Sequence, residues 1–211
     1  MQVIPGVLET NWDEIERKLD IIKTFTDTVH IDLIDGKFCD NKTFFDPKPF
    51  NKYSNELFLE LHMMVIDPVE FIEPWAEAGF KRFLGHIEHM SSQKEFVSVA
   101  KKYGEAGLAL DGPTHVNAIK IPFDELDSIL VYTSHKVGHS GPPLMDDRLD
   151  KVRHLRQLTN IPIEVDGGIN DRTIIKAKES GADCFVSTSY ITGSENPEEK
   201  FNTLKSLLNS A

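Results

Sequence analysis

Short apolar runs alternate with longer amphipathic stretches along the whole chain. The runs are four to eight residues long, and most lack a regular alternation of apolar and polar positions. This pattern is typical of parallel strands that are covered on both faces. The starts of the runs lie roughly 20–35 residues apart, the length of a strand with its crossover helix. We predict strands at 3–8, 28–33, 57–64, 82–86, 106–110, 128–132, 163–166 and 184–187.

Capping residues and helix breakers lie between these runs. Asn11 can cap a helix that begins at Trp12, and the apolar positions after Pro197 repeat with the period of a last helix. The stretch 35–55 has few periodic signals and is interpreted as a long loop with room for one helical turn. Further helices are expected at 69–78, between Ser91 and Gly104, and at 173–180.

Eight strand–helix units in 211 residues predict a single (β/α)8 TIM barrel domain over residues 1–211. No Ser/Gly linker or low-complexity tract divides the chain. The alternative is an open doubly wound sheet. Such a sheet usually carries a glycine-rich loop after its first strand, whereas the chain reads Leu-Glu-Thr-Asn at 8–11. The barrel is therefore favoured.

Composition and charge exclude several classes of partner. The formal net charge of −11 argues against general binding of a nucleic acid backbone, although one small anion can still be bound locally. No apolar run approaches the length of a membrane span, and the first residues lack the pattern of a signal segment. Cys39 and Cys184 are too few for a disulfide framework. We expect a cytoplasmic protein without nucleic acid or membrane partners.

Residues of ligand type lie where three of the predicted strands end. His30 and Asp32 are two apart and project to the same side of one strand, while His62 and Asp166 end two others. Each residue alone can be an ordinary core histidine or a helix cap. Taken together, two imidazoles and two carboxylates suit Zn²⁺, Fe²⁺, Mn²⁺ or Co²⁺ better than Ca²⁺ or Mg²⁺.

The segments around these residues resemble those of a known enzyme family. The stretch 30–38, followed by Asn41 and Thr43, resembles the His-x-Asp-x-Met-Asp-Gly-x-Phe-x-x-Asn-x-Thr motif of ribulose-phosphate 3-epimerases. The Leu-His-Met-Met at 61–64, the His-Ile-Glu at 86–88 and the Glu-Val-Asp-Gly-Gly-Ile at 164–169 are similar to further segments of that family, in the same order. The chain thus resembles a divergent member.

The resemblance implies a metal-dependent epimerase on a barrel of the ribulose-phosphate-binding type. It implies that His30, Asp32, His62 and Asp166 hold one divalent ion, and that Asp32 and Asp166 also transfer the protons. The implied reaction is inversion of C3 of a ketose phosphate through an enediolate, by default from D-ribulose 5-phosphate to D-xylulose 5-phosphate in the pentose phosphate pathway. A homo-oligomer, either a dimer or a larger ring, is implied in the same way.

Glycine-rich turns and hydroxyl groups after the later strands are candidates for binding the phosphate. Met64, together with Met63 and Ile34, can form an apolar wall that limits access of water, although ordinary core packing explains these residues equally well. The candidate phosphate and loop residues are Gly138, Gly141, Gly167, Gly168, Thr188 and Ser189.

The chain departs from the family pattern in the loops that would bind substrate. The family has Ser-Ala-Asp after the first strand, where this chain has Glu9 and Thr10. The loop after the sixth strand contains His135 and Lys136, which can bring positive charge to an anion or can lie in a solvated loop. Glu9 can pair with Lys136 or Lys37, or can bind a sugar hydroxyl.

These departures leave three alternatives to the default reaction. One is an epimerase for another ketose phosphate, such as a hexulose 6-phosphate. Another is a decarboxylase or aldol-type lyase on the same barrel, but such relatives typically need a Lys beside the strand-end Asp, and Lys37 lies only in the following loop. The last is a non-catalytic paralogue that binds a phosphorylated sugar.

Overall fold

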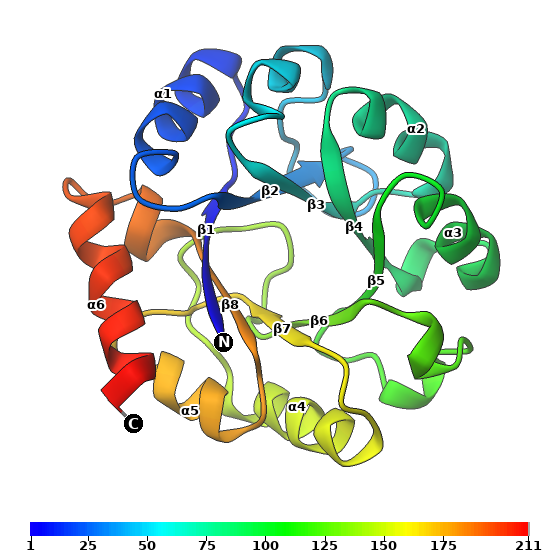
Figure 1. Ribbon diagram of the computed structural model, residues 1–211. Helices are drawn as coiled ribbons and strands as arrows, with labels where there is room; N and C mark the ends of the chain where they lie inside the picture. The colour runs from blue at the N-terminus through cyan, green and yellow to red at the C-terminus, as the bar shows by residue number, and fades with distance from the viewer. Residues whose placement is uncertain (211) are drawn as a thin grey trace.

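The eight predicted strands close into a parallel barrel. The computed structural model of the chain describes residues 1–210, and its strands follow one another around the ring in sequence order. Figure 1 shows this ring of strands with the helices outside it. The (β/α)8 TIM barrel prediction is confirmed. The strands are β1 (Gln2–Val7), β2 (Thr28–Ile34), β3 (Phe58–Met64), β4 (Phe80–His86), β5 (Glu105–Leu110), β6 (Ser128–Tyr132), β7 (Ile163–Asp166) and β8 (Cys184–Ser187).

Six α-helices surround the barrel in the described part of the chain. The Asn11 side chain caps the first of them by accepting the N–H of Glu14 at 3.0 Å. The third helix is capped by Ser92 rather than by Ser91. No described helix combines the length and apolar character needed to cross a membrane. The helices are α1 (Trp12–Ile22), α2 (Val69–Glu77), α3 (Gln93–Ala100), α4 (Asp146–Leu158), α5 (Ile174–Glu179) and α6 (Pro197–Ser210).

Two connections lack an α-helix. The loop with one helical turn predicted over 35–55 is confirmed, whereas the expectation of eight strand–helix units was wrong after β5. After β2 the chain forms only the 3-10 turn η1 (Lys48–Tyr53), and after β5 only the short turns η3 (Val116–Ala118) and η4 (Phe123–Glu125). Prolines explain both cases, because they lack an N–H and disfavour a helical residue before them. They stand at 47 and 49 in the first connection and at 113 and 122 in the second.

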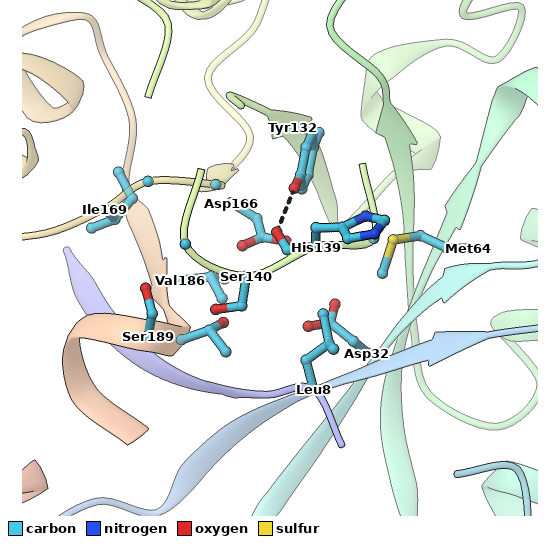
Figure 2. A pocket seen from close by; sticks show the side chains of 15 residues that line it. Leu8, Asp32, Met64, Tyr132, His139, Ser140, Asp166, Ile169, Val186 and Ser189 are labelled. Carbon is cyan, nitrogen blue, oxygen red and sulfur yellow. Dashed lines mark hydrogen bonds between the residues drawn. The ribbon is translucent and has the colours of Figure 1, made fainter. Parts of the chain in front are cut away.

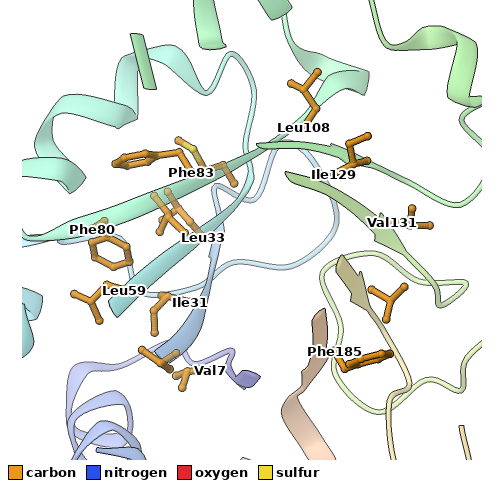
Figure 3. Close-up of a cluster of buried hydrophobic side chains, with 14 of the residues drawn as sticks. Val7, Ile31, Leu33, Leu59, Phe80, Phe83, Leu108, Ile129, Val131 and Phe185 are labelled. Carbon is orange, nitrogen blue, oxygen red and sulfur yellow. The ribbon is translucent and has the colours of Figure 1, made fainter. Parts of the chain in front are cut away.

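The residues of each strand alternate between the helical shell and the barrel axis. On β3, Leu59, Leu61 and Met63 belong to the large hydrophobic cluster between strands and helices. Figure 3 shows part of this cluster, with residues such as Phe80 and Phe83 from the adjoining strand. The expected pairing of Met63 with Met64 in one apolar wall was therefore wrong, because consecutive strand residues point to opposite faces.

Inward-facing residues of β4, β5 and β6 form an apolar part of the barrel interior. Leu84, Ala109, Leu130 and Tyr132 form a small separate cluster there. The usual interior of this fold consists of layers of branched aliphatic side chains. The strands β2, β3 and β7 instead contribute buried His, Asp and Glu residues. This polar part of the interior leads directly to the carboxyl ends of the strands.

Candidate active site

Four buried side chains converge at the carboxyl end of the barrel. They are His30 and Asp32 from β2, His62 from β3 and Asp166 from β7, and their ligand atoms all lie within 4.8 Å of one another. His62 Nδ1 lies 3.0 Å from Asp32 Oδ1 and 3.3 Å from Asp166 Oδ2. His30 Nε2 lies 3.4 Å from Asp32 Oδ1 and 3.9 Å from Asp166 Oδ2. We call these four residues the His/Asp group.

Strand register brings this group together. Asp32 on β2 is paired with His62 on β3, so that the two side chains point to the same side of neighbouring strands. His30 lies one inward-facing position earlier on β2. Asp166 is the last residue of β7, which is separated from β2 in the ring by β1 and β8. The two carboxylates therefore enter the site from different directions.

The donor atoms of the His/Asp group fit a divalent ion. His30 Nε2 is buried and has no hydrogen-bond partner in the described structure, which is a costly state for a polar atom. A cation held between the four side chains would satisfy it. Two imidazole nitrogens with carboxylate oxygens are the donor set that Zn²⁺, Fe²⁺, Mn²⁺ and Co²⁺ accept.

Electrostatics at the group also favours positive charge. Burial disfavours the charged form of His30, but the carboxylates of Asp32, Glu164 and Glu60 outweigh it and hold the pKa of His30 well above its usual value. Burial alone would raise the pKa of Asp32, yet hydrogen bonds with His30 and His62 lower that pKa to about 2. The carboxylates thus create a strongly negative environment in which a cation is stabilised.

His62 is connected by hydrogen bonds to His86 and, through it, to Glu88. Its Nε2 lies 2.9 Å from Nε2 of His86, and His86 Nδ1 lies 2.9 Å from Glu88 Oε2. Glu88 also accepts the backbone N–H of Asp111 at 2.8 Å. If His86 Nδ1–H donates to Glu88, then His86 Nε2 accepts the proton of His62 Nε2. His62 Nδ1 is then free to act as a ligand.

A pocket opens above the His/Asp group. Asp32 and Asp166 both point into it, with Met64 on one side and Ser140 and Ser189 on another (Figure 2). Among the residues expected from the sequence to contact substrate, the pocket is lined by Met64, Gly138, Gly141, Gly167, Gly168, Thr188 and Ser189.

Two loops meet at the mouth of this pocket. The hydroxyl of Tyr132 donates to the carbonyl of Lys136 at 2.8 Å and lies 3.2 Å from that of His139. The amide of Asn41 donates to the carbonyl of Gly138 at 2.6 Å. The Asn41 bond connects the loop after β2 to the loop after β6, and the Tyr132 bonds hold the second loop against the end of β6. The second loop carries Gly138 in the left-handed region, with φ of 76°.

Three expected substrate residues lie outside the pocket lining. Glu9 Oε1 is 2.6 Å from the amine of Lys18, so the expected pairing with Lys136 or Lys37 was wrong. Lys136 is exposed and lies 3.5 Å from Asp40. His135 is also exposed and does not line the pocket. The loops carry these side chains away from the pocket lining, where Lys18 pairs with Glu9 and Asp40 with Lys136.

Several residues that line the pocket were not among the candidates expected from the sequence. Leu8, Tyr132, Ile169 and Val186 do so from β6 and from the segments at the ends of β1, β7 and β8. Leu8 and Ile169 stand next to the candidates Glu9 and Gly168, while Tyr132 and Val186 lie within predicted strands. The signal available was position alone, since inward-facing residues at the carboxyl ends of barrel strands line the active site whatever their polarity.

The fold and the buried polar group together define a TIM-barrel enzyme whose chemistry lies at the carboxyl ends of the strands. Residues 2–192 match the ribulose-phosphate 3 epimerase family. The chain belongs to this family and is an enzyme of the epimerase type.

Curated relatives agree with this assignment. The chain is 32% identical over 199 residues to ribulose-phosphate 3-epimerase of Chlamydia trachomatis, covering 89% of this chain and 84% of the relative. It is 31% identical to ribulose-phosphate 3-epimerase of Schizosaccharomyces pombe, over 97% of this chain and 92% of the relative. The cytoplasmic isoform of the rice enzyme matches with the same identity and coverage.

Solved structures share the fold at much lower identity. 3-Hexulose-6-phosphate synthase from Salmonella typhimurium superposes with a TM-score of 0.77 at 16% identity, over 100% of this chain and 99% of that one. 3-Keto-L-gulonate-6-phosphate decarboxylase from Vibrio cholerae gives 0.75 at 16% identity, over 99% and 97%. These two likenesses concern the architecture only.

Proposed function

We propose that this enzyme interconverts D-ribulose 5-phosphate and D-xylulose 5-phosphate by inverting C3. The observation that carries the proposal is the placement of Asp32 and Asp166, which reach one pocket from two separated strands beside a pair of buried imidazoles. Epimerisation next to a ketone requires removal of a proton from one face of the carbon and return of a proton to the other. The names of the curated relatives supply the pentulose phosphate as the substrate.

Asp32 and Asp166 are the proton-transfer groups in this proposal. One carboxylate takes the C3 proton of one epimer to leave an enediolate, and the other carboxylic acid returns a proton to the opposite face. The roles exchange for the reverse reaction. Zn²⁺, Fe²⁺, Mn²⁺ or Co²⁺ held by His30, Asp32, His62 and Asp166 would supply Lewis-acid stabilisation of the negative charge on the substrate oxygens.

The surrounding residues orient the substrate and exclude water. Met64 and Tyr132 narrow the pocket on the side of the reacting carbon. Ser140, Ser189 and the turn at Gly168 offer hydroxyl and backbone N–H groups for the phosphate. The lining contains no Lys or Arg among the described residues, so the phosphate is bound by neutral donors in this proposal.

Deuterium incorporation tests the reaction directly. In D2O, D-ribulose 5-phosphate should gain one deuterium at C3 at a rate close to that of net inversion, because the abstracted proton exchanges with solvent. Mass spectrometry of the recovered sugar measures it. If C3 exchange is faster with a hexulose 6-phosphate than with D-ribulose 5-phosphate, the hexulose 6-phosphate is the preferred substrate. Complete lack of C3 exchange with both sugars would exclude the proposed chemistry.

Lys136 should contribute little to substrate binding. We expect Lys136→Ala to change kcat/KM by less than about threefold, because its exposed ion pair with Asp40 is worth only ~0–1 kcal/mol. Ser189→Ala is the comparison, and the loss of one hydrogen bond of about 1 kcal/mol should raise KM roughly fivefold. Steady-state kinetics measures both variants. A loss above about tenfold in Lys136→Ala would mean that this loop binds the phosphate after all.

A further inference from the structure

A row of polar side chains crosses four strands below the His/Asp group. His30 on β2 is in register with Glu60 on β3, Glu60 with Arg82 on β4, and Arg82 with Glu105 on β5. Glu60 Oε1 lies 2.6 Å from Nδ1 of His30, and Glu60 Oε2 accepts a hydrogen bond from Arg82. Arg82 Nε in turn donates to Glu105 at 2.7 Å. The row therefore joins His30 to a partly exposed carboxylate at the edge of the barrel.

Stability does not explain this row. The side chains of His30 and Glu60 are 0% exposed and that of Arg82 is 15% exposed, in a layer that aliphatic residues usually fill. A buried ion pair rarely stabilises a protein more than well-packed apolar residues of the same volume, because desolvation offsets the attraction. We therefore look for the function of Glu60, Arg82 and Glu105 in their effect on the adjoining residue of the His/Asp group.

That neighbour is the imidazole of His30. A carboxylate that accepts from Nδ1–H fixes the proton on that nitrogen and the orientation of the ring. The opposite nitrogen, Nε2, faces Asp32 and Asp166 and has no hydrogen-bond partner, so that a cation bound between them can take the place of a proton on this nitrogen. Arg82 occupies the second oxygen of Glu60, so that the carboxylate cannot rotate freely. The row thus prepares Nε2 as a ligand atom.

A second buried carboxylate provides an internal comparison. Glu164 on β7 lies 3.3 Å from the same Nδ1 of His30, but neither of its oxygens makes a hydrogen bond. It lies 3.9 Å from Arg82, beyond hydrogen-bonding distance. Glu60 and Glu164 thus both lie beside Nδ1 of His30. Only Glu60 makes a hydrogen bond with this nitrogen, and only Glu60 is also held by a hydrogen bond from Arg82.

We propose that Glu60, held by Arg82, is a positioning residue that orients His30 and thereby sets the affinity of the enzyme for its divalent ion. The inference rests on the proposed function, since it concerns the metal named there. In this proposal Glu60 acts through His30 and is not itself a ligand of the ion.

Glu60→Gln tests this role with little change in volume. The amide has one acceptor oxygen, and Arg82 and His30 both need it. When Arg82 takes it, the amide nitrogen faces Nδ1 of His30 and moves the imidazole proton to Nε2, where the ion must bind. We expect the dissociation constant for Co²⁺ to rise about 10–100-fold, as is typical when a residue behind a ligating histidine is replaced. Competition with a chromophoric chelator measures it, and the visible spectrum of bound Co²⁺ should change.

Control variants distinguish the positioning of His30 by Glu60 from a general effect of lost negative charge and from a loss of folding stability. Glu164→Gln removes a carboxylate at the same nitrogen and should change the Co²⁺ dissociation constant by less than about threefold. Arg82→Lys keeps the charge but loses the forked contact with Glu60 and Glu105, so it should give a smaller loss of affinity than Glu60→Gln. Glu60→Gln should also lower the melting temperature of the metal-free protein, because Arg82 loses a buried ion-pair partner, so Co²⁺ is titrated at a temperature where circular dichroism shows the metal-free variant fully folded.

Three results would overturn the proposal. One is an unchanged Co²⁺ dissociation constant in Glu60→Gln. Another is an equal loss in Glu164→Gln, which would indicate a general charge effect. The third is a loss of Co²⁺ affinity that appears only at temperatures where the metal-free variant is partly unfolded. Failure of the wild-type protein to bind any divalent ion would instead remove the metal from the proposed function itself.

Discussion

Asp166→Asn is expected to abolish epimerisation while the barrel stays folded. Asparagine has nearly the same shape but cannot act as a base for the C3 proton. It also removes one negative charge from the His/Asp group, which should weaken binding of the divalent ion. We expect kcat to fall by about 10⁴-fold, the upper end of the range for a lost acid/base group. The fold should persist because the backbone carbonyl of Asp166, which accepts from Thr133 at 2.6 Å, is unchanged.

Isotope exchange and a matched variant make this result specific. Residual C3 exchange in Asp166→Asn should be confined to one of the two epimers, because Asp32 serves only one face of the substrate. Asp150→Asn is the control, since this exposed carboxylate on α4 pairs with Arg153. It should keep wild-type kinetics. Retention of more than about a tenth of kcat in Asp166→Asn would contradict its role as a proton-transfer group.

Removal of the divalent ion should be the second large effect. Chelation is expected to lower kcat by about 10²–10³-fold, corresponding to several kcal/mol of charge stabilisation on the substrate oxygens. Addition of Zn²⁺, Mn²⁺ or Co²⁺ should restore turnover, whereas Ca²⁺ should not, because it prefers six or more oxygen ligands.

Metal content must be followed together with rate. Elemental analysis should find about one ion per chain before chelation. Full turnover at a metal content far below that value would exclude a metal-dependent epimerase.

Much of the fold was predictable because the strands carry strong local signals. The predicted strand 128–132 coincides with β6, and the strand predicted at 82–86 begins two residues late relative to β4 (Phe80–His86). The His/Asp group was predictable for a related reason. His30 and Asp32 stand two apart, so the pleat alone puts them on one face.

The row of polar side chains from His30 to Glu105 could not be predicted from the spacing of residues within one strand. Glu60, Arg82 and Glu105 lie in three different strands, and no local pattern shows that they are neighbours. Register between strands depends on the closed barrel, which a strand-by-strand interpretation does not contain. The misplacement of Glu9 has a similar cause, because the loop beyond a strand turns in a direction that its own residues do not specify.

The absence of Lys and Arg from the described pocket lining has a consequence for how substrate arrives. The protein carries a formal net charge of −11, and a phosphorylated sugar is itself an anion. No electrostatic funnel draws the two together, so the long-range field opposes their encounter and capture depends on short-range contacts. Dissolved salt weakens this repulsion, and the rate of encounter should increase with ionic strength rather than fall.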